Sequence, residues 1–394
     1  MGYSGVRGGQ EAIAAAEELV RRGREEGGTP RLGVDQIIER LRLGVDRVMG
    51  EGGLWAPELA ARAIRQSEGD VQEAAQLLRA HRSTLPRLAY SAPVHANELR
   101  IVRRISSAFR NPPGDQILGR TLDYVGRLLD LLPDEAEAPD PTPTAIPHEA
   151  AAGHTPASGR APNGTANGQS SAPGLAPGGA GRPHDEDRRP PRLINVLREM
   201  DLLVDRRRAD DPEPYDITRV PARPGAPRSA RLTAMARAET GALVHLWYAY
   251  TFDPPARDGG TPSHGHEIPG EVRHGRLPVR VTHPLTGNPV QVAEVRVTDV
   301  ETLDDLNRPG EDRTRLDAGY GMCFGHNERK AIAMAGLDLM VHRDAGRTSL
   351  DQDVLVTLDG IESAGFLEHL KLPHYVDFRS TLDRKRALRE RVAG

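Results

Sequence analysis

The sequence has little cysteine, few aromatic residues and no long apolar segment. Its single cysteine, Cys323, excludes an intrachain disulfide and fits a reducing compartment. It also excludes a Cys₄ zinc site or an iron–sulfur cluster held by this chain alone. No apolar run approaches the roughly 18 residues of a membrane-spanning helix. The first ten residues, MGYSGVRGGQ, lack a hydrophobic signal core. We therefore expect a soluble, cytoplasmic protein with no membrane partner.

Basic residues are not in excess, and two common nucleotide-binding motifs are absent. The 394 residues include 52 lysines and arginines against 56 aspartates and glutamates, a net charge of −4. No segment combines basic residues with interleaved aromatics, so no nucleic-acid partner is expected. The chain contains neither G-x-x-x-x-G-K-[ST] nor G-x-G-x-x-G. Phosphoryl or dinucleotide chemistry on those scaffolds is therefore not expected.

Apolar residues recur at helical spacing over residues 1–132. The predicted helices cover 12–20, 34–48, 57–64, 71–78, 99–109 and 122–132. Pro57 suits a first helical position, because its missing N–H is not needed there. Residues 134–191 hold 11 prolines, eight glycines and no aromatic residue. Such a segment cannot bury enough apolar surface to offset its chain entropy, so we expect a disordered linker.

Behind this linker the pattern indicates helices and an antiparallel sheet. Residues 193–200 predict a helix, and 242–251 (ALVHLWYAYT) read as a buried strand. Alternating apolar residues around 277–281 and 290–292 flank a turn and predict a hairpin, with a bulge after residue 294. Asn327 is the expected N-cap of a helix reaching residue 340, and a basic helix is expected at 379–391.

The predicted fold class is α+β, with a helical N-terminal half, a disordered linker and a C-terminal antiparallel sheet with helices. The expected parts are a helical part at 1–133, the linker at 134–191 and an α+β part at 192–394.

Three glycines ahead of the predicted helix at 328–340 are candidates for binding phosphate. Gly319, Gly321 and Gly325 lead into the helix start, where free N–H groups and the positive end of the dipole favour an anion. Arg329 and Lys330 add cationic donors. On this hypothesis Gly321→Val weakens phosphate binding with little effect on the fold. A structural turn between strand and helix is the more common explanation of such a pattern.

Charged residues on both sides of 242–251 are further candidates. Paired arginines grip a polyphosphate through two donors each, which gives Arg228, Arg231 and Arg273 a substrate-binding role. A carboxylate such as Glu271 stabilises positive charge on a sugar ring and is the predicted catalytic group. Such residues form surface ion pairs more often. The segment holding His264, His266 and His274 reads as a polar loop with possible additional metal ligands.

Near the C-terminus two histidines, His369 and His374, stand five residues apart with Pro373 between them. On a helix this spacing turns the two rings about 140° apart, so they do not share a helical face. Pro373 favours a bend, which brings both rings to one point. On spacing alone, packing explains such a pair more often than a metal.

Several longer motifs together resemble one protein family. They are DRVMGEGG at 46–53, LLRAHRSTL at 77–85, PGDQILG at 113–119, GYGMCFG at 319–325 and HLKLPHYVDF at 369–378. In this order they are similar to PhnI, a subunit of the bacterial carbon–phosphorus lyase system for phosphonate breakdown. The resemblance covers the chain except for roughly residues 134–190.

The resemblance implies a reaction and a set of partners. Proteins of this family exchange the adenine of ATP for methylphosphonate at ribose C1′, giving α-D-ribose 1-methylphosphonate 5-triphosphate, and act as nucleosidases when alone. It implies Mg²⁺ with ATP, an alkylphosphonate substrate and the companion subunits PhnG, PhnH, PhnJ, PhnK and PhnL. It also implies a Zn²⁺ site, shared with PhnJ, that uses His369 and His374. Lys371 and Asp377 would orient these imidazoles.

Two other hypotheses stay open. In the first, the chain is an assembly subunit that presents two zinc ligands while its partners carry out catalysis. The sequence contains no strong catalytic constellation, which favours this alternative. Without the resemblance, the histidine pair alone would suggest a metal-dependent hydrolase.

Overall fold

The computed structural model describes residues 9–122, 129, 189–206, 210, 212–252, 268–306, 311–343, 348–357 and 375–393. All described helices and strands belong to one compact unit, made of Met1–Arg120 and Arg188–Gly394. The second unit, Thr121–Asp187, lies almost entirely outside the described residues. The predicted linker is described only from residue 189, and the predicted helix at 122–132 only at residues 122 and 129.

The N-terminal helices follow the predicted apolar stripes. They are α1 (Gly9–Glu26), α2 (Val34–Arg40), α3 (Arg42–Gly52), α4 (Pro57–Gln66) and α5 (Val71–Thr84). The stripe at 34–48 is broken at Leu41, between α2 and α3. Pro57 opens α4 as predicted, and the Asp70 carboxylate caps α5 by accepting N–H bonds from Gln72 and Glu73. Helices α2 to α5 bury one core around Ile37, Met49 and Leu78.

A four-stranded antiparallel sheet follows, in the order β1-β2-β3-β4. Its strands are β1 (Arg100–Ser106), β2 (Ile268–Thr282), β3 (Pro289–Asp305) and β4 (Leu316–Phe324), and a short 3₁₀ turn, η1 (Ala96–Glu98), precedes β1. The predicted hairpin is β2–β3, and its bulge lies at Val292, slightly before the predicted position. The helix predicted at 99–109 is wrong. This segment forms β1, because it pairs with β2 in antiparallel fashion and gains backbone hydrogen bonds there.

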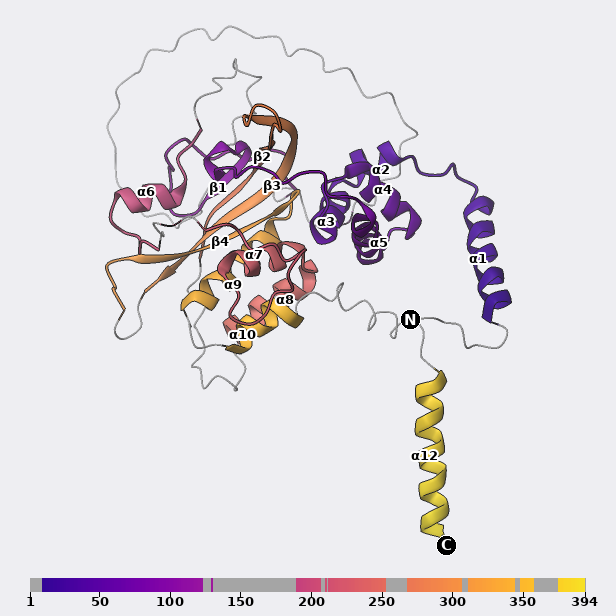
Figure 1. The fold of residues 1–394 in the computed structure, drawn as a ribbon. Helices are drawn as coiled ribbons and strands as arrows, with labels where there is room; N and C mark the ends of the chain where they lie inside the picture. Colours follow the sequence, from indigo (N-terminus) through magenta and orange to yellow (C-terminus); the bar gives the residue numbers. More distant parts are fainter. Residues whose placement is uncertain are drawn as a thin grey trace, which may run out of the picture. The chain divides into compact units, whose positions relative to one another are not determined.

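Further helices precede and follow the strands. They are α6 (Leu193–Glu199), α7 (Arg228–Arg237), α8 (Thr240–Phe252), α9 (Glu328–Arg343), α10 (Thr348–Gln352), a π-helical turn η3 (Asp353–Thr357) and α12 (Tyr375–Ala393). Helix α9 packs along β3 and β4, and α7 and α8 pack on α9 (Figure 1). The strand predicted at 242–251 is wrong: this run is α8, whose apolar side chains contact neighbours on several sides.

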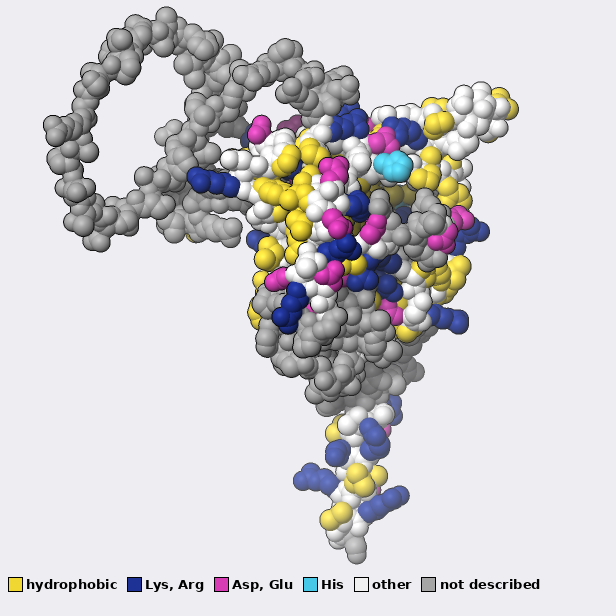
Figure 2. Space-filling view, turned by 90° about the vertical axis from the view of Figure 1, so that its left-hand side faces the viewer, with side chains coloured by type: hydrophobic (Ala, Val, Ile, Leu, Met, Phe, Trp, Pro, Cys, Tyr) yellow, Lys and Arg dark blue, Asp and Glu magenta, His cyan; other side chains and the backbone are white. Residues whose placement is uncertain are grey.

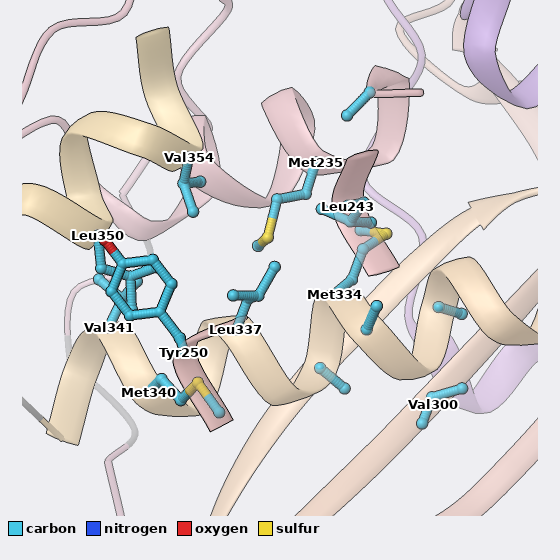
Figure 3. Close-up of a cluster of buried hydrophobic side chains, with 14 of the residues drawn as sticks. Met235, Leu243, Tyr250, Val300, Met334, Leu337, Met340, Val341, Leu350 and Val354 are labelled. Atoms are coloured by element: carbon cyan, nitrogen blue, oxygen red, sulfur yellow. The ribbon is translucent and has the colours of Figure 1, made fainter. Parts of the chain in front are cut away.

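The largest core lies between α7, α8 and α9. Figure 3 shows Met334, Leu337 and Met340 of α9 directed towards Met235 of α7 and Tyr250 of α8. The whole arrangement confirms the predicted α+β class, with a helical N-terminal half and a C-terminal antiparallel sheet.

The basic C-terminal helix is also confirmed as α12, and Figure 2 shows its lysine and arginine side chains. Elsewhere on the face drawn in Figure 2, acidic and basic side chains are interspersed. Within the described ranges, no helix is long and apolar enough to cross a membrane.

Candidate functional site

One face of the sheet carries a group of buried charges beside the small apolar core around Leu193 and Leu303. Its members alternate with core residues along β1, β2 and β3, as side chains on one face of a strand must. We call this set the charged layer; it consists of Arg104, Arg192, Glu271, Arg273, Asp299 and Glu301. Arg192 comes from the residue just before α6 and the other five from strands.

Glu271, the predicted catalytic carboxylate, lies within this layer. It is 1 % exposed, forms an ion pair with Arg104 and accepts a hydrogen bond from the Leu193 N–H at 2.8 Å. Arg104 donates its remaining hydrogens to the carbonyl oxygens of Pro113, Asp115 and Pro191. Both carboxylate oxygens of Glu271 are thus engaged inside the protein. Its catalytic role stays a prediction. In the structure, Glu271 joins β1 to β2 and to the start of α6.

Arg273, a predicted substrate-binding residue, is engaged in the same way. Its guanidinium grips Asp299 through two bonds, at 3.0 and 2.5 Å, and both side chains are about 2 % exposed or less. Arg192 bonds Glu301 at 2.5 Å and lies 3.4 Å from Asp299. Burial alone lowers the pKa of Arg192, but these two carboxylates outweigh it and raise the pKa. The layer is therefore an internally neutralised network.

The other two predicted arginines belong to α7 and also have carboxylate partners. Arg228 makes a two-pronged contact with Asp338 of α9, at 2.8 and 2.5 Å. Arg231 bonds Asp351 of α10 at 3.2 Å and the Ala226 carbonyl at 2.8 Å. The structure thus brings Arg273 and Glu271 into one layer, whereas Arg228 and Arg231 fasten helices to one another.

Close packing explains why the three predicted positions are glycines. A Cβ on Gly319 or Gly321 of β4 would lie well inside the van der Waals contact of a backbone oxygen of α9. Gly325 has φ +73°, and a Cβ there would come within 2.5 Å of Asp46. Lys330 is buried and donates to the Ala238 carbonyl at 2.7 Å, while Arg329 is exposed. Phosphate binding by these glycines stays a prediction, but substituting Gly321 must also disturb the fold.

Asp46 of α3 connects the N-terminal helices to the sheet. Its carboxylate is fully buried and accepts bonds from Arg296 of β3 and from the His326 N–H, both at 2.9 Å. The Asn327 side-chain amide donates to the Asp46 carbonyl at 3.1 Å and to the Phe324 carbonyl at 2.6 Å. Helix α9 begins after Asn327 as predicted, and the Asn327 backbone carbonyl accepts the first helical bond. The side chain of Asn327 is thus used to join α3 to the strand end.

Two histidines meet beside this junction. His274, predicted in a polar loop, instead lies in β2 with 5 % exposure, and its ring centre is 4.7 Å from that of His326. Burial, helped by the charges of His326, Arg296 and Arg42, lowers the His274 pKa to about 4. His274 is therefore neutral at pH 7. His264 and His266 lie outside the described residues.

Glu328 closes this cluster. It lies 3.4 Å from the His326 ring and receives a 2.5 Å bond from Arg103 of β1. Burial alone raises the Glu328 pKa, but the hydrogen bonds from His326 and Arg103 outweigh it and lower the pKa to about 2. His274, His326, Glu328 and Arg103 form a polar group that the sequence did not predict, because it combines β1, β2 and the start of α9.

A large open cleft lies apart from these networks. It has a volume of about 1020 Å³. Its wall combines the ends of α3 and α5, the segment 85–90, the turn at 217–219, Arg237 and Val281. Among the described residues, the wall contains four arginines and no carboxylate; the arginines are Arg82, Arg87, Arg219 and Arg237. We call it the arginine cleft.

The cleft arginines are held by neighbouring groups. Arg82 donates to the Gly53 carbonyl at 3.2 Å. Arg87 binds Asp216 at 2.7 Å and Thr218 at 2.6 Å. The guanidinium carbons of Arg87 and Arg219 lie 4.9 and 6.0 Å from the ring centre of Tyr90, a cation–π arrangement. Hydrogen bonds from Thr218 and then Arg87 lower the Asp216 pKa to about 2.

Sequence reasoning did not predict this cleft, although two of the quoted motifs reach it. Gly53 ends the motif at 46–53, and Arg82 lies in the motif at 77–85. The spacing between these motifs gave no sign that they converge.

The predicted zinc ligands cannot be placed in the same way. His369, His374 and Lys371 lie outside the described residues. Asp377 falls within α12, but its side chain is not described. In the described portion of the chain, no group of three or more histidine, cysteine or acidic side chains is arranged to hold a metal.

Comparison with known proteins gives full-length matches. A family model described as bacterial phosphonate metabolism protein (PhnI) matches residues 2–392. A putative C-P lyase subunit protein HtxH of Stutzerimonas stutzeri is 38 % identical, covering 100 % of this chain and 97 % of the relative.

Two further relatives carry the name alpha-D-ribose 1-methylphosphonate 5-triphosphate synthase subunit PhnI. That of Escherichia coli (strain K12) is 35 % identical, covering 98 % of both chains. That of Rhizobium meliloti (strain 1021) is 33 % identical, covering 98 % of this chain and 95 % of the relative. This chain therefore belongs to the PhnI family of bacterial phosphonate metabolism proteins.

Proposed function

We propose that this chain is the PhnI subunit of a carbon–phosphorus lyase system and contributes to α-D-ribose 1-methylphosphonate 5-triphosphate synthesis. The carrying observation is similarity over almost the full length of two relatives that bear this name. With companion subunits, the reaction exchanges the adenine of ATP for methylphosphonate at ribose C1′. Alone, the chain transfers the ribosyl group to water and acts as a purine nucleosidase.

The chemistry makes three demands on the protein. The bond between C1′ and the purine nitrogen breaks, and the electron pair and a proton go to the departing base. Positive charge develops on the ribose ring before an oxygen of the phosphonate, or of water, bonds to C1′. The triphosphate on C5′ needs cationic donors and Mg²⁺ throughout. In the described residues, the arginine cleft is the feature that fits the third demand.

The test is base release from ATP by the purified chain. We expect adenine to appear with water as acceptor, and the ribose methylphosphonate product to appear only when companion subunits and methylphosphonate are added. Chromatography of the base and phosphorus NMR of the product measure the two outcomes. No adenine release, alone or with the companion subunits, would contradict the proposal.

A zinc site using His369 and His374 is part of this proposal. Two imidazole nitrogens are zinc ligands of the right type but only half of the roughly four that zinc takes, so another chain, solvent or substrate must complete the set. When bound, the metal supplies a cationic centre at the subunit contact. We expect His369→Ala to remove zinc from the assembled complex and leave the isolated chain folded. Full zinc content in that variant complex would overturn this assignment.

An assembly role is the second candidate, and the charged layer favours it. The carboxylate predicted to act on the sugar, Glu271, is buried and engaged by Arg104 and the Leu193 N–H. Catalytic groups would then come mainly from partners, while this chain supplies zinc ligands and a docking surface. Base release by the isolated chain separates the two candidates.

A further inference from the structure

We propose that a cluster of arginines and histidines beside the start of α9 binds the phosphonate group of a small alkylphosphonate. We call it the junction cluster; it consists of Arg42, Arg120, His274, Arg296 and His326. This inference rests on the proposed function, because the reaction named there uses methylphosphonate as the acceptor of the ribosyl group. It gives that substrate a place in this chain and uses none of the predicted phosphate-binding glycines.

Three arginines come together here from segments far apart in the sequence. Arg42, at the start of α3, donates to Nδ1 of His326 at 3.2 Å, and Arg296 of β3 bonds Asp46 at 2.9 Å. Burial is the main cause that lowers the pKa of Arg42. Asp46 opposes this change, whereas the charges of Arg120 and Arg296 add to it. Both arginines therefore lie close enough to Arg42 to repel its charge.

The segment after β1 holds Arg120 in this position. Gly119 has φ +61°, and a Cβ there would lie 2.5 Å from the Val102 carbonyl oxygen, so a glycine is needed for this close approach to β1. Arg103 of β1 also donates to the Leu118 carbonyl at 2.7 Å. The Arg120 side chain is exposed, and within the described residues it has no hydrogen-bond or ion-pair partner. Its donors are thus open to a ligand.

The three guanidinium groups share one carboxylate among the described residues. Asp46 lies 2.9 Å from Arg296 and 4.0 Å from Arg42, and the other carboxylate nearby, Glu328, is engaged by β1. Arg42 uses one donor on the histidine ring and keeps others free. Arginine is well suited to a phosphorus oxyanion, since its planar fork offers two parallel donors to two oxygens. An anion bound here would relieve the repulsion between the arginines.

A buried histidine supplies an acceptor at the same place. The Thr298 hydroxyl donates its one hydrogen to the Gly325 carbonyl at 2.7 Å, so it accepts from Nδ1 of His274 at 3.2 Å. Burial and the nearby charges lower the pKa of this ring to about 4, so Nε2 carries a lone pair at pH 7. In the described part of the chain Nε2 has no partner, although His274 is only 5 % exposed. An unpaired buried acceptor points to a ligand that donates a hydrogen.

These features select a phosphorus oxyanion over other anions. The last hydrogen of a phosphate monoester has a pKa of about 6, and a phosphonate likewise keeps one P–OH in part of its population near neutral pH. Such an ion offers charged oxygens to the arginines and its P–OH to Nε2 of His274. Sulfate carries no hydrogen at this pH and leaves Nε2 unpaired.

Space for the organic group lies beside Arg296. Its guanidinium carbon is 5.3 Å from the ring centre of Trp55, and both residues line a pocket of about 250 Å³. The described wall of this pocket consists of Trp55, Pro57, Arg276, Glu294, Val295 and Arg296. The volume is below the usual range of about 300–1,000 Å³ for larger ligands, so it suits a short alkyl chain.

The experiment measures binding of methylphosphonate, inorganic phosphate and sulfate to the full chain by titration calorimetry at pH 7. The main variant is Arg120→Glu, because this side chain is exposed and its change leaves the buried contacts intact. The second is Arg42→Gln, which removes the charge and keeps an amide donor. The matched controls are Arg62→Glu and Arg40→Gln, the same changes at exposed positions of α4 and α2. Thermal unfolding of each variant verifies the fold.

We expect Arg120→Glu to raise the dissociation constant for methylphosphonate about tenfold or more, and Arg42→Gln by several-fold. Each control should stay within about twofold of the unchanged protein. In the unchanged protein, methylphosphonate should bind more tightly than sulfate and inorganic phosphate. Equal or tighter binding of either inorganic anion would overturn the assignment to a phosphonate.

The remaining outcomes separate the site from the proposed function. Unchanged affinity in both cluster variants, or no binding of methylphosphonate to the unchanged chain, would overturn the site and leave the proposed function standing. Cluster-dependent binding of methylphosphonate without base release from ATP would support the site and count against the proposed function.

Discussion

The charged layer and the arginine cleft are built from the same residue type in opposite situations. In the layer, Arg104, Arg273 and Arg192 each contact a buried carboxylate. In the cleft, four arginines line an open wall whose described residues include no carboxylate. Removing one partner of a buried pair leaves an uncompensated buried charge, whereas an exposed cation such as Arg219 stays hydrated. The role of an arginine in this protein therefore depends on its partner and its exposure, which the sequence does not give.

The largest expected effect comes from breaking the layer. Glu271→Gln leaves Arg104 buried without its counter-charge, and we expect a loss of about 3–5 kcal/mol in the free energy of unfolding. Chemical denaturation measures it. The control is Glu294→Gln, which breaks an ion pair whose Arg100 side chain is 69 % exposed, and here we expect less than about 1 kcal/mol. Similar losses of stability in the two variants would contradict the distinction between buried and exposed ion pairs.

The pH dependence of stability tests whether the His274 ring is shielded from water. The folded pKa of His274, about 4, lies below its ordinary value of 6.5. The unfolded chain therefore binds more protons between these values, and stability is complete above pH 6.5 and falls as the pH drops towards 4. The difference corresponds to about 3 kcal/mol at the acid end. Comparing unfolding at pH 7 and pH 4.5, we expect His274→Gln to show a smaller loss than the unchanged protein. An identical pH dependence would mean that water reaches the ring.

The third test concerns the glycines of β4. Gly321→Ala pushes a methyl group into the backbone of α9, and we expect a loss of about 1–3 kcal/mol. Gly28→Ala is the control, since nothing lies within 4 Å of a Cβ at that position. Denaturation gives the stability of both variants, and ATP affinity at a temperature where both are folded gives the second measurement. Weaker ATP binding at unchanged stability would restore the phosphate-loop hypothesis.

The smallest expected effect sharpens the cleft side of the comparison. Asp216→Asn removes the carboxylate facing Arg87 and keeps an oxygen that accepts the Thr218 N–H bond. Releasing one cation should tighten tripolyphosphate binding by about two- to fivefold at low salt, because exposed pairs contribute little. The gain should vanish at high salt. A weaker affinity would show that positioning of Arg87 by Asp216 matters more than the repulsion between Asp216 and the anion.

Local patterns predicted much of the fold. Helices α3 to α5 and the β2–β3 hairpin follow their apolar spacing and turn residues. The two segments assigned to the wrong kind of regular structure have physical causes. Leu99, Val102 and Ile105 happen to recur at helical spacing, yet the segment finds a strand partner more than 160 residues away. The run in α8 is apolar on several sides, and such a run suits a buried helix as well as a buried strand.

The site was harder to predict than the fold. Glu271 and Arg273 were singled out by their charge. Charge alone does not show whether an oppositely charged residue lies on the neighbouring strand. The described wall of the cleft combines five segments between Gly53 and Val281 that lie far apart in the sequence. Only tertiary structure brings them together, so a single sequence carries no local signal for it.

The position of β1 has a consequence for how the chain is made. Arg104 of β1 precedes its partner Glu271 by 167 residues. At about 5–20 residues per second, a ribosome needs roughly 10–30 s to synthesise that interval. During this time β1 is a strand with open edges, the kind of segment that recruits other chains.

The sequence of β1, RIVRRIS, carries three arginines, and such charges suppress edge-to-edge pairing. Arg104, which neutralises Glu271 inside the sheet, is thus expected to oppose such pairing in the nascent chain. Arg104 is a hydrated charge until β2 has been synthesised, and then forms half of a buried ion pair.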